Sequence, residues 1–192
     1  TVTAPVAYNV QKDLYYCTIQ SAIDDASTIM TQTVEVLDGI NTESLTIDRA
    51  LTLTSRNSAA LSSIASANPA VPTISITSSG VTVQNLTLTN PNGQNAIFTN
   101  NNSNITITGN HVTNVGGASL VSQPINAISI SGTGNAVSTI AVTNNTIDNL
   151  TGGNFGSVSA ITVGYDSGNF DVTALTISGN TITDIDAMIT PW

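Results

Sequence analysis

The side chains best suited to bind a ligand lie together in one predicted loop, VGYDSGNFDV, at positions 163 to 172. An aromatic ring can stack against a sugar, and carboxylate or amide oxygens can accept hydrogen bonds from its hydroxyls or coordinate calcium. The order of these groups does not match an EF-hand loop, so we expect no metal site or cofactor, with calcium as the one ion they could hold. A polar surface loop with a half-buried ring would have the same composition. The candidate ligand-binding residues are Tyr165, Asp166, Asn169, Phe170 and Asp171.

Two carboxylates, Asp148 and Asp184, could act as acid and base, because they occupy adjacent columns of successive sequence repeats. A structural interpretation competes with this one, since Asp184 replaces Asn149 at a predicted corner and Asp148 suits a solvated face. His111 is the single histidine, and the sequence signals no partner for it. We therefore assign no catalytic residue; if the chain is an enzyme, we expect a polysaccharide hydrolase that uses carboxylates.

Short strands must position these side chains, because one eleven-residue pattern recurs at a fixed interval. ITITGNHVTNV begins at position 105, IAVTNNTIDNL at 140 and LTISGNTITDI at 175, and the related VTVQNLTLTNP begins at 81. Alternating apolar and polar residues predict strands. Register-matched copies predict a solenoid in which equivalent strands of adjacent turns pair in parallel. The sequence therefore predicts an all-β fold, a parallel β-helix.

Aligned copies of the pattern place identical amides in columns at the points where the strands must bend. Such amides can hydrogen-bond to the backbone and to the amide of the next turn. The residue before the first column is Gly109, Asn144 or Gly179, types that tolerate a left-handed backbone. We predict structural ladders at two corners, formed by Asn110, Asn145 and Asn180 and by Asn114 and Asn149.

One segment has a helical period. YYCTIQSAIDDASTIM, from Tyr15 to Met30, places Ile19, Ala22, Ile23 and Ala26 on one apolar stripe after a possible Thr18 cap. We predict a single domain over residues 1–192, with an extended segment at 1–15, a capping helix at 16–30 and solenoid turns at 33–192.

Composition excludes several classes of partner. The net charge is −9, charged residues make up 8%, and no Lys or Arg follows Arg56. A nucleic-acid backbone needs clustered cations, so we expect no nucleic-acid binding. We also expect no membrane insertion, because the chain lacks an 18-residue apolar run.

The segment TIQSAIDDASTIMTQTVEVLDGINTESLTIDRALTLTS, from Thr18 to Ser55, resembles the entry of right-handed parallel β-helix proteins, which include pectate lyases, pectin methylesterases and bacterial surface proteins with β-helix repeats. The resemblance implies a right-handed coil and an entry helix. Where the esterases carry Gly-x-Tyr-x-Glu, this chain has Asn41 between Gly39 and Glu43. The esterase catalytic motifs have no counterpart, and the lyases need cations to hold an anionic substrate, which this chain lacks after Arg56.

Our first functional hypothesis is a non-catalytic extracellular or cell-surface module, structural or adhesive. An uncovered last turn offers unpaired strand edges. We therefore expect either that the chain continues beyond Trp192 or that it self-associates or stacks end to end into filaments, in which the segment TVTAPVAYNV adds a strand. The alternative is a carbohydrate-active enzyme or polysaccharide-binding module that acts through the loop face.

Two surface features leave further interpretations open. Outward Thr residues on a flat face, such as Thr82, Thr106 and Thr108, could bind ice, although Ala141 interrupts their column. Asn-x-Ser/Thr sequons mark possible N-glycosylation sites in a secreted chain, at Asn85, Asn101, Asn104, Asn144 and Asn149.

Overall fold

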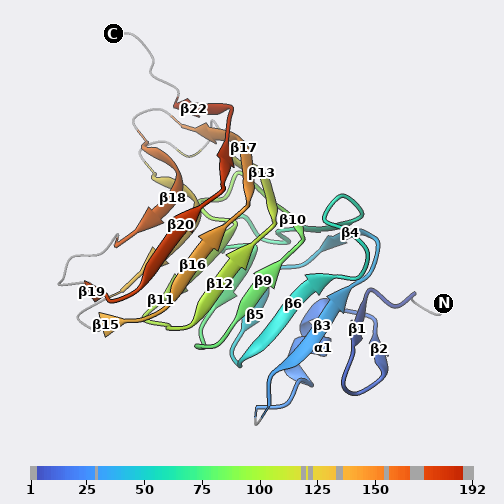
Figure 1. The fold of residues 1–192 in the computed structure, drawn as a ribbon. Helices are drawn as coiled ribbons and strands as arrows, with labels where there is room; N and C mark the ends of the chain where they lie inside the picture. Colours follow the sequence, from blue (N-terminus) through green and yellow to red (C-terminus); the bar gives the residue numbers. More distant parts are fainter. Residues whose placement is uncertain are drawn as a thin grey trace, which may run out of the picture.

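The computed structural model describes residues 4–28, 30–117, 120, 123–132, 136–153, 156–164 and 171–187. Within these ranges the chain is mostly strand, and nearly all strand pairs are parallel. The predictions of an all-β fold and of parallel pairing are therefore confirmed. The strands form stacked sheets, an arrangement compatible with a β-helix or another solenoid-like fold (Figure 1).

Three larger sheets and one pair of strands account for the described strands. Sheet A runs in the order β2 (Leu14–Tyr16), β1 (Ala7–Asn9), β3 (Gln32–Val36), β6 (Leu51–Ser55), β9 (Thr82–Gln84), β12 (Ile105–Thr108), β16 (Ile140–Thr143), β20 (Leu175–Ser178). Sheet B runs in the order β21 (Thr181–Ile182), β17 (Thr146–Gly152), β13 (His111–Gly116), β10 (Thr87–Pro91), β7 (Ser62–Ala65), β4 (Gly39–Thr42), and β22 (Ile185–Ala187) also pairs with β17. Sheet C runs in the order β18 (Val158–Val163), β14 (Ile125–Ser131), β11 (Ile97–Asn100), β8 (Ile74–Ile76), β5 (Leu45–Ile47). The separate pair joins β15 (Ala136–Val137) to β19 (Asp171–Val172).

From β3 onward the chain visits sheets A, B and C in turn, and we call each such set of strands a rung. The first rung is β3 to β5, the fourth is β12 to β14, and the last described one is β20 to β22. Equivalent residues of successive rungs lie side by side, because Ile105 pairs with Ile140 and Ile140 pairs with Leu175. The period of the sequence pattern thus sets the register of the sheets.

The core lies between the sheets and is built from columns of branched aliphatic residues. Within each strand the buried residues alternate with outward ones, so that Ile105 and Ile107 are buried while Thr106 and Thr108 are partly exposed. Neighbouring strands repeat this pattern in register and give a continuous apolar interior. No helix within the described residues is long and apolar enough to cross a membrane.

The N-terminal region differs from the prediction in its details. Strands β1 and β2 form an antiparallel hairpin, and β1 also pairs antiparallel with β3. The one described helix, α1 (Ile19–Asp24), is shorter than the expected 16–30. It begins later because Tyr15 and Tyr16 belong to β2, and it ends earlier because Ala26 N donates to Ile23 O in a closing turn. Its apolar stripe is buried, as the periodicity predicts.

Candidate functional site

The predicted ligand-binding loop lies largely outside the described residues, which stop at Gly164 and resume at Asp171. Tyr165, Asp166, Asn169 and Phe170 therefore have no structural assignment. Asp171 is exposed at the start of β19, where it pairs with Ala136 of β15. The structure thus places one member of the predicted set, at the crossing from sheet C back to sheet A.

Of the two carboxylates that the sequence suggests as an acid and base, Asp148 contacts a histidine in the structure. Asp148 on β17 lies beside His111 on the neighbouring β13, with 2.9 Å between Oδ2 and Nε2. Burial raises the pKa of Asp148, but hydrogen bonds from Thr113 and His111 outweigh it and lower the pKa overall. Asp184 lies at a corner with a left-handed φ of 51°. Asp148 is therefore an ionised acceptor on the outer face of sheet B, and His111 does have a partner that the sequence did not signal.

The first Asn column forms a hydrogen-bonded ladder at the corner between sheets A and B. Asn145 Oδ1 accepts from Asn110 N at 3.0 Å and from Asn110 Nδ2 at 3.1 Å, and Asn145 Nδ2 donates to Ile107 O at 3.0 Å. Asn180 repeats these contacts one rung later, with Asn145 and with Val142 O. Because the amides of Asn110 and Asn145 are buried and used within the protein, these positions are structural.

The second Asn column behaves differently. Asn114 and Asn149 adopt left-handed backbones, with φ of 52° and 51°, and their side chains are exposed. They turn the chain at the middle of β13 and β17. Their structural contribution is therefore the backbone conformation, which Asn tolerates better than most residues.

The column just before the first ladder alternates Asn and Gly and has the left-handed backbone that the sequence predicts. Asn85, Gly109, Asn144 and Gly179 follow one another along the stack, all with φ between 54° and 66°. A Cβ built on Gly109 would lie 2.6 Å from Asn85 Oδ1, and one on Gly179 would lie 2.3 Å from Asn144 Oδ1. Each amide thus occupies the space that a side chain on the following rung would need.

This packing bears on the predicted sequons. The amides of Asn85 and Asn144 lie against glycine, so a glycan there would have to displace them. Asn104 and Asn149 are exposed and have left-handed backbones, and Asn101 is partly exposed. If the chain is glycosylated, Asn104 and Asn149 are the better placed acceptors.

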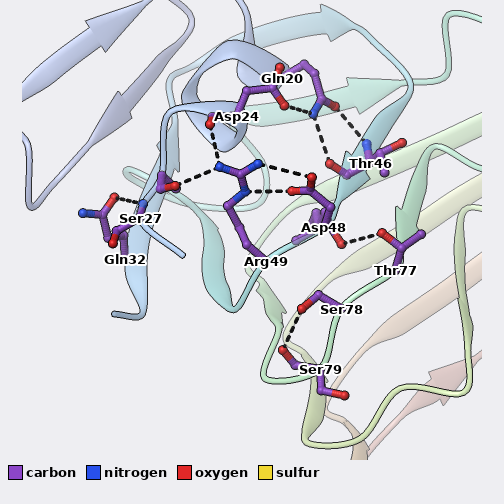
Figure 2. Close-up of polar contacts among 12 residues, drawn as sticks. Gln20, Asp24, Ser27, Gln32, Thr46, Asp48, Arg49, Thr77, Ser78 and Ser79 are labelled. Atoms are coloured by element: carbon purple, nitrogen blue, oxygen red, sulfur yellow. Dashed lines mark hydrogen bonds and ion pairs between the residues drawn. The ribbon is translucent and has the colours of Figure 1, made fainter. Parts of the chain in front are cut away.

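A polar cluster fixes α1 to the first rung, and the sequence did not signal it. Glu43 accepts from Ile19 N and Gln20 N at 2.9 and 3.0 Å, at the start of the helix. Figure 2 shows Arg49 between Asp48 and the end of α1, where its guanidinium donates to Asp24 O at 2.5 Å. Gln20 and Thr46 exchange two hydrogen bonds, at 2.8 and 3.0 Å. Glu43 therefore has a structural role here, as the acceptor for the first helical N–H groups.

Lys12 and Arg56, the other two cationic residues, also lie in the N-terminal region. Lys12 pairs with Asp25 at 2.8 Å, and Arg56 lies 3.6 Å from Glu35 and over the rings of Tyr8 and Tyr15. The hydrogen bond from Lys12, followed by that from Tyr16, lowers the pKa of Asp25. All three Lys and Arg side chains of the protein therefore hold the N-terminal region.

A shallow groove lies where the chain crosses from sheet B to sheet C. Two adjoining hollows of about 200 and 410 Å³ share Pro69, Ala70 and Gln94. Gln94 Nε2 donates to Gln123 Oε1 at 2.7 Å across neighbouring rungs, and Asn95 Oδ1 is buried with no hydrogen-bond partner among the described residues. The groove is lined by Pro69, Ala70, Val71, Pro72, Asn92, Gln94, Asn95, Phe98, Leu120 and Gln123.

The chemistry of this groove suits a neutral ligand. Its described lining combines proline and aromatic surface with amides and has no titratable side chain. Such a surface can stack on a sugar ring and exchange hydrogen bonds with hydroxyls, but it offers no acid or base. Within the described ranges no group of three or more His, Cys, Asp or Glu could hold a metal ion.

Comparison with known proteins adds no assignment. No family model, no curated protein and no solved structure matches this chain. The function must therefore be argued from the geometry.

The last described rung exposes apolar side chains whose equivalents in the preceding rung are buried. Leu175 and Ile177 on β20 are 43% and 47% exposed, whereas Ile140 and Val142, their partners on β16, are 1% and 0% exposed. Ile182 and Ile185 continue the exposed apolar surface along sheet B. We call these four residues the apolar end.

Proposed function

We propose that this chain is a non-catalytic extracellular module, a right-handed parallel β-helix with a structural or adhesive role. In this proposal the rungs form one continuous coil, and the β1–β2 hairpin together with α1 closes its first rung. The extracellular setting rests on the resemblance to surface proteins with β-helix repeats. The proposal is carried by the apolar end, which is suited to bind another coil.

The apolar end has the properties of an unfinished sheet edge. Its four side chains stand in the columns that form the core of the preceding rungs, and β20 has a neighbour on one side among the described strands. Covering such residues removes apolar surface from water, and an unpaired edge offers backbone groups to an incoming strand. The apolar end therefore favours contact with a partner whose strands can continue the same sheets.

A second copy of the chain meets this requirement through its N-terminal edge. Strand β1 is antiparallel to both β2 and β3, so β2 runs in the same direction as β3 and β20. Placing β2 of one copy beside β20 of another would keep sheet A parallel across the junction, and Leu14 and Tyr15 on β2 are exposed. Such a head-to-tail contact is heterologous and builds filaments.

The test compares two adjacent residues of β20 that face opposite ways. In sedimentation velocity over a micromolar concentration series, the average mass of the unmodified chain should rise with concentration. Ile177→Lys, which places a charge on the apolar end, should stay monomeric. Thr176→Lys carries the same charge on the outer face and should associate like the unmodified chain.

Two results would overturn the proposal of stacking. One is an unmodified chain that remains monomeric throughout the series, and the other is association that survives Ile177→Lys unchanged. Circular dichroism on all three proteins separates loss of association from loss of folding.

A second candidate function rests on the groove beside Phe98, which suits a neutral polysaccharide. In this case Phe98→Ala should abolish retention on an insoluble or immobilised neutral glycan, while Tyr15→Ala, which removes an exposed ring at the N-terminal end, should leave retention intact. Retention without release of reducing ends identifies a binding module. Release of reducing ends that Asp148→Asn abolishes would instead identify a carboxylate hydrolase.

A further inference from the structure

The outer face of sheet A carries two parallel columns that are rich in threonine. The register of the strand pairs aligns them through six strands, from β3 to β20. One column is Thr33, Thr52, Thr82, Thr106, Ala141 and Thr176, and the other is Glu35, Thr54, Gln84, Thr108, Thr143 and Ser178. Apart from the buried Thr54, these side chains are partly or fully exposed. Figure 1 shows β6, β9, β12, β16 and β20 side by side.

The corresponding face of sheet B provides an internal comparison. Its outer columns contain threonines too, but Ile40 and Ala65 interrupt them at one end and the His111–Asp148 pair interrupts them in the middle. On sheet A the outward positions from β6 to β20 carry no charged residue. The two faces share a strand geometry and differ in regularity and charge.

The face of sheet A is also held rigid. The Asn110, Asn145 and Asn180 ladder begins two residues after β12, β16 and β20, and it links these strands at a fixed separation. Thr143 Oγ1 donates to Thr108 Oγ1 at 2.9 Å, which fixes the orientation of neighbouring side chains. The hydroxyls and methyls therefore form a lattice with repeats of about 4.8 Å between strands and about 6.6 Å along them.

A lattice of this kind selects a ligand that is itself a rigid, uncharged and periodic surface. The repeat between strands is close to an oxygen–oxygen repeat of ice, and threonine offers a hydroxyl to join the lattice and a methyl group that orders adjacent water. A crystalline polysaccharide would be met by flat aromatic rings, and no outward position of sheet A from β6 to β20 is aromatic. We propose that the Thr-rich face of sheet A binds the surface of ice. This inference is independent of the stacking proposed above.

The experiment measures thermal hysteresis and inhibition of ice recrystallisation by the full chain. The unmodified protein should show both activities. Thr106→Lys, at the centre of the face, should lose most of each, while Thr146→Lys on the outer face of sheet B should keep them. Ala141→Thr completes a column and should raise the hysteresis, a gain that a misfolded protein cannot produce.

Three outcomes would overturn the proposal. They are an unmodified protein without activity, equal activity in Thr106→Lys and the unmodified protein when circular dichroism is the same, and no gain in Ala141→Thr. Retention on microcrystalline cellulose or chitin that Thr106→Lys abolishes, without ice activity, would reassign the face to a crystalline polysaccharide.

Discussion

The two ends of the molecule are completed by different interactions. At the first rung, a hairpin and a short helix pack against the sheets, and Lys12, Arg49 and Arg56 hold them through ion pairs and carbonyl contacts. At the last described rung, the core columns continue into Leu175 and Ile177, which lie half-exposed. Figure 1 shows α1 and the β1–β2 hairpin at one end of the molecule, and β20 at the far edge of sheet A.

The two ends also differ in where the few basic residues of the chain lie. Charged residues are only 8% of the sequence, and all three cations lie in the N-terminal region. The middle rungs need none, because apolar columns and Asn ladders hold them together. The last rung has the columns and part of the ladder but no covering element among the described residues, so it is the place where added contacts would stabilise the protein most.

The largest expected effect contrasts an inner rung with the last one. Ile107→Ala removes a fully buried side chain and should lower the free energy of unfolding by about 3 to 4 kcal/mol. Ile177→Ala, in the same column but 47% exposed, should cost less than about 1 kcal/mol in dilute protein. Urea unfolding of both variants measures the difference. Equal losses would mean that the last rung is covered in the free monomer.

The Asn ladder gives the next contrast. Asn145→Ala removes four hydrogen bonds and leaves the buried Asn110 N without its acceptor, which should cost about 2 to 3 kcal/mol. Asn180→Ala removes three hydrogen bonds of the same kind near the open end, where water can replace them, and should cost about 1 kcal/mol. Equal losses in the free energy of unfolding, measured in urea, would mean that access to water does not weaken the ladder at the open end.

A smaller effect should appear at the N-terminal end. Arg49→Ala removes the donors to the carbonyls of Asp24 and Ala26 and should lower stability by about 1 kcal/mol. The more exposed Arg56 makes a longer ion pair, so Arg56→Ala should cost less. Hydrogen exchange should report faster opening of residues 19–24 in Arg49→Ala, with β12 unaffected. Uniform loss of protection would contradict a local role for Arg49.

The smallest expected effect is a loss of stability around α1 at acid pH. The pKa of Asp25 is lowered chiefly by the hydrogen bond from Lys12, and that of Asp48 chiefly by the hydrogen bond from Arg49. A carboxyl group whose pKa is lower in the folded protein than in the unfolded chain stabilises the fold at pH values above the unfolded pKa of about 3.9. This contribution is lost as the pH falls through the pKa of the folded protein. Protection of α1 should therefore be constant from pH 7 to about 5 and decline below about 4. A decline already present near neutral pH would require a different titrating group.

The sequence predicted the features that repeat and missed those that depend on contacts between distant residues. The spacing of the repeated pattern predicted the parallel pairing of β12, β16 and β20, and Gly109 and Asn144 predicted left-handed corners. These features are local or periodic, so the pattern contains them. The helix boundary depended on β2 pairing with β1, which a helical period cannot reveal.

The candidate sites were harder to predict for the same reason. The bond between Glu43 and the start of α1 joins residues 24 positions apart, and the groove beside Phe98 assembles side chains from three rungs. The regular Thr face was visible as an alternation, but its continuity from Thr33 to Thr176 required the register of every strand pair. Of the predicted binding loop, Asp171 lies within the described residues and its partners in that loop do not.

Hydrogen exchange at several protein concentrations tests the stacking of the apolar end most directly. The segment Leu175–Ser178 should gain protection as the concentration of the unmodified chain rises, while the inner strand Ile105–Thr108 keeps the same protection throughout. In Ile177→Lys the segment should exchange at one rate at every concentration. Exchange of Leu175–Ser178 that does not depend on concentration in the unmodified chain would contradict the account.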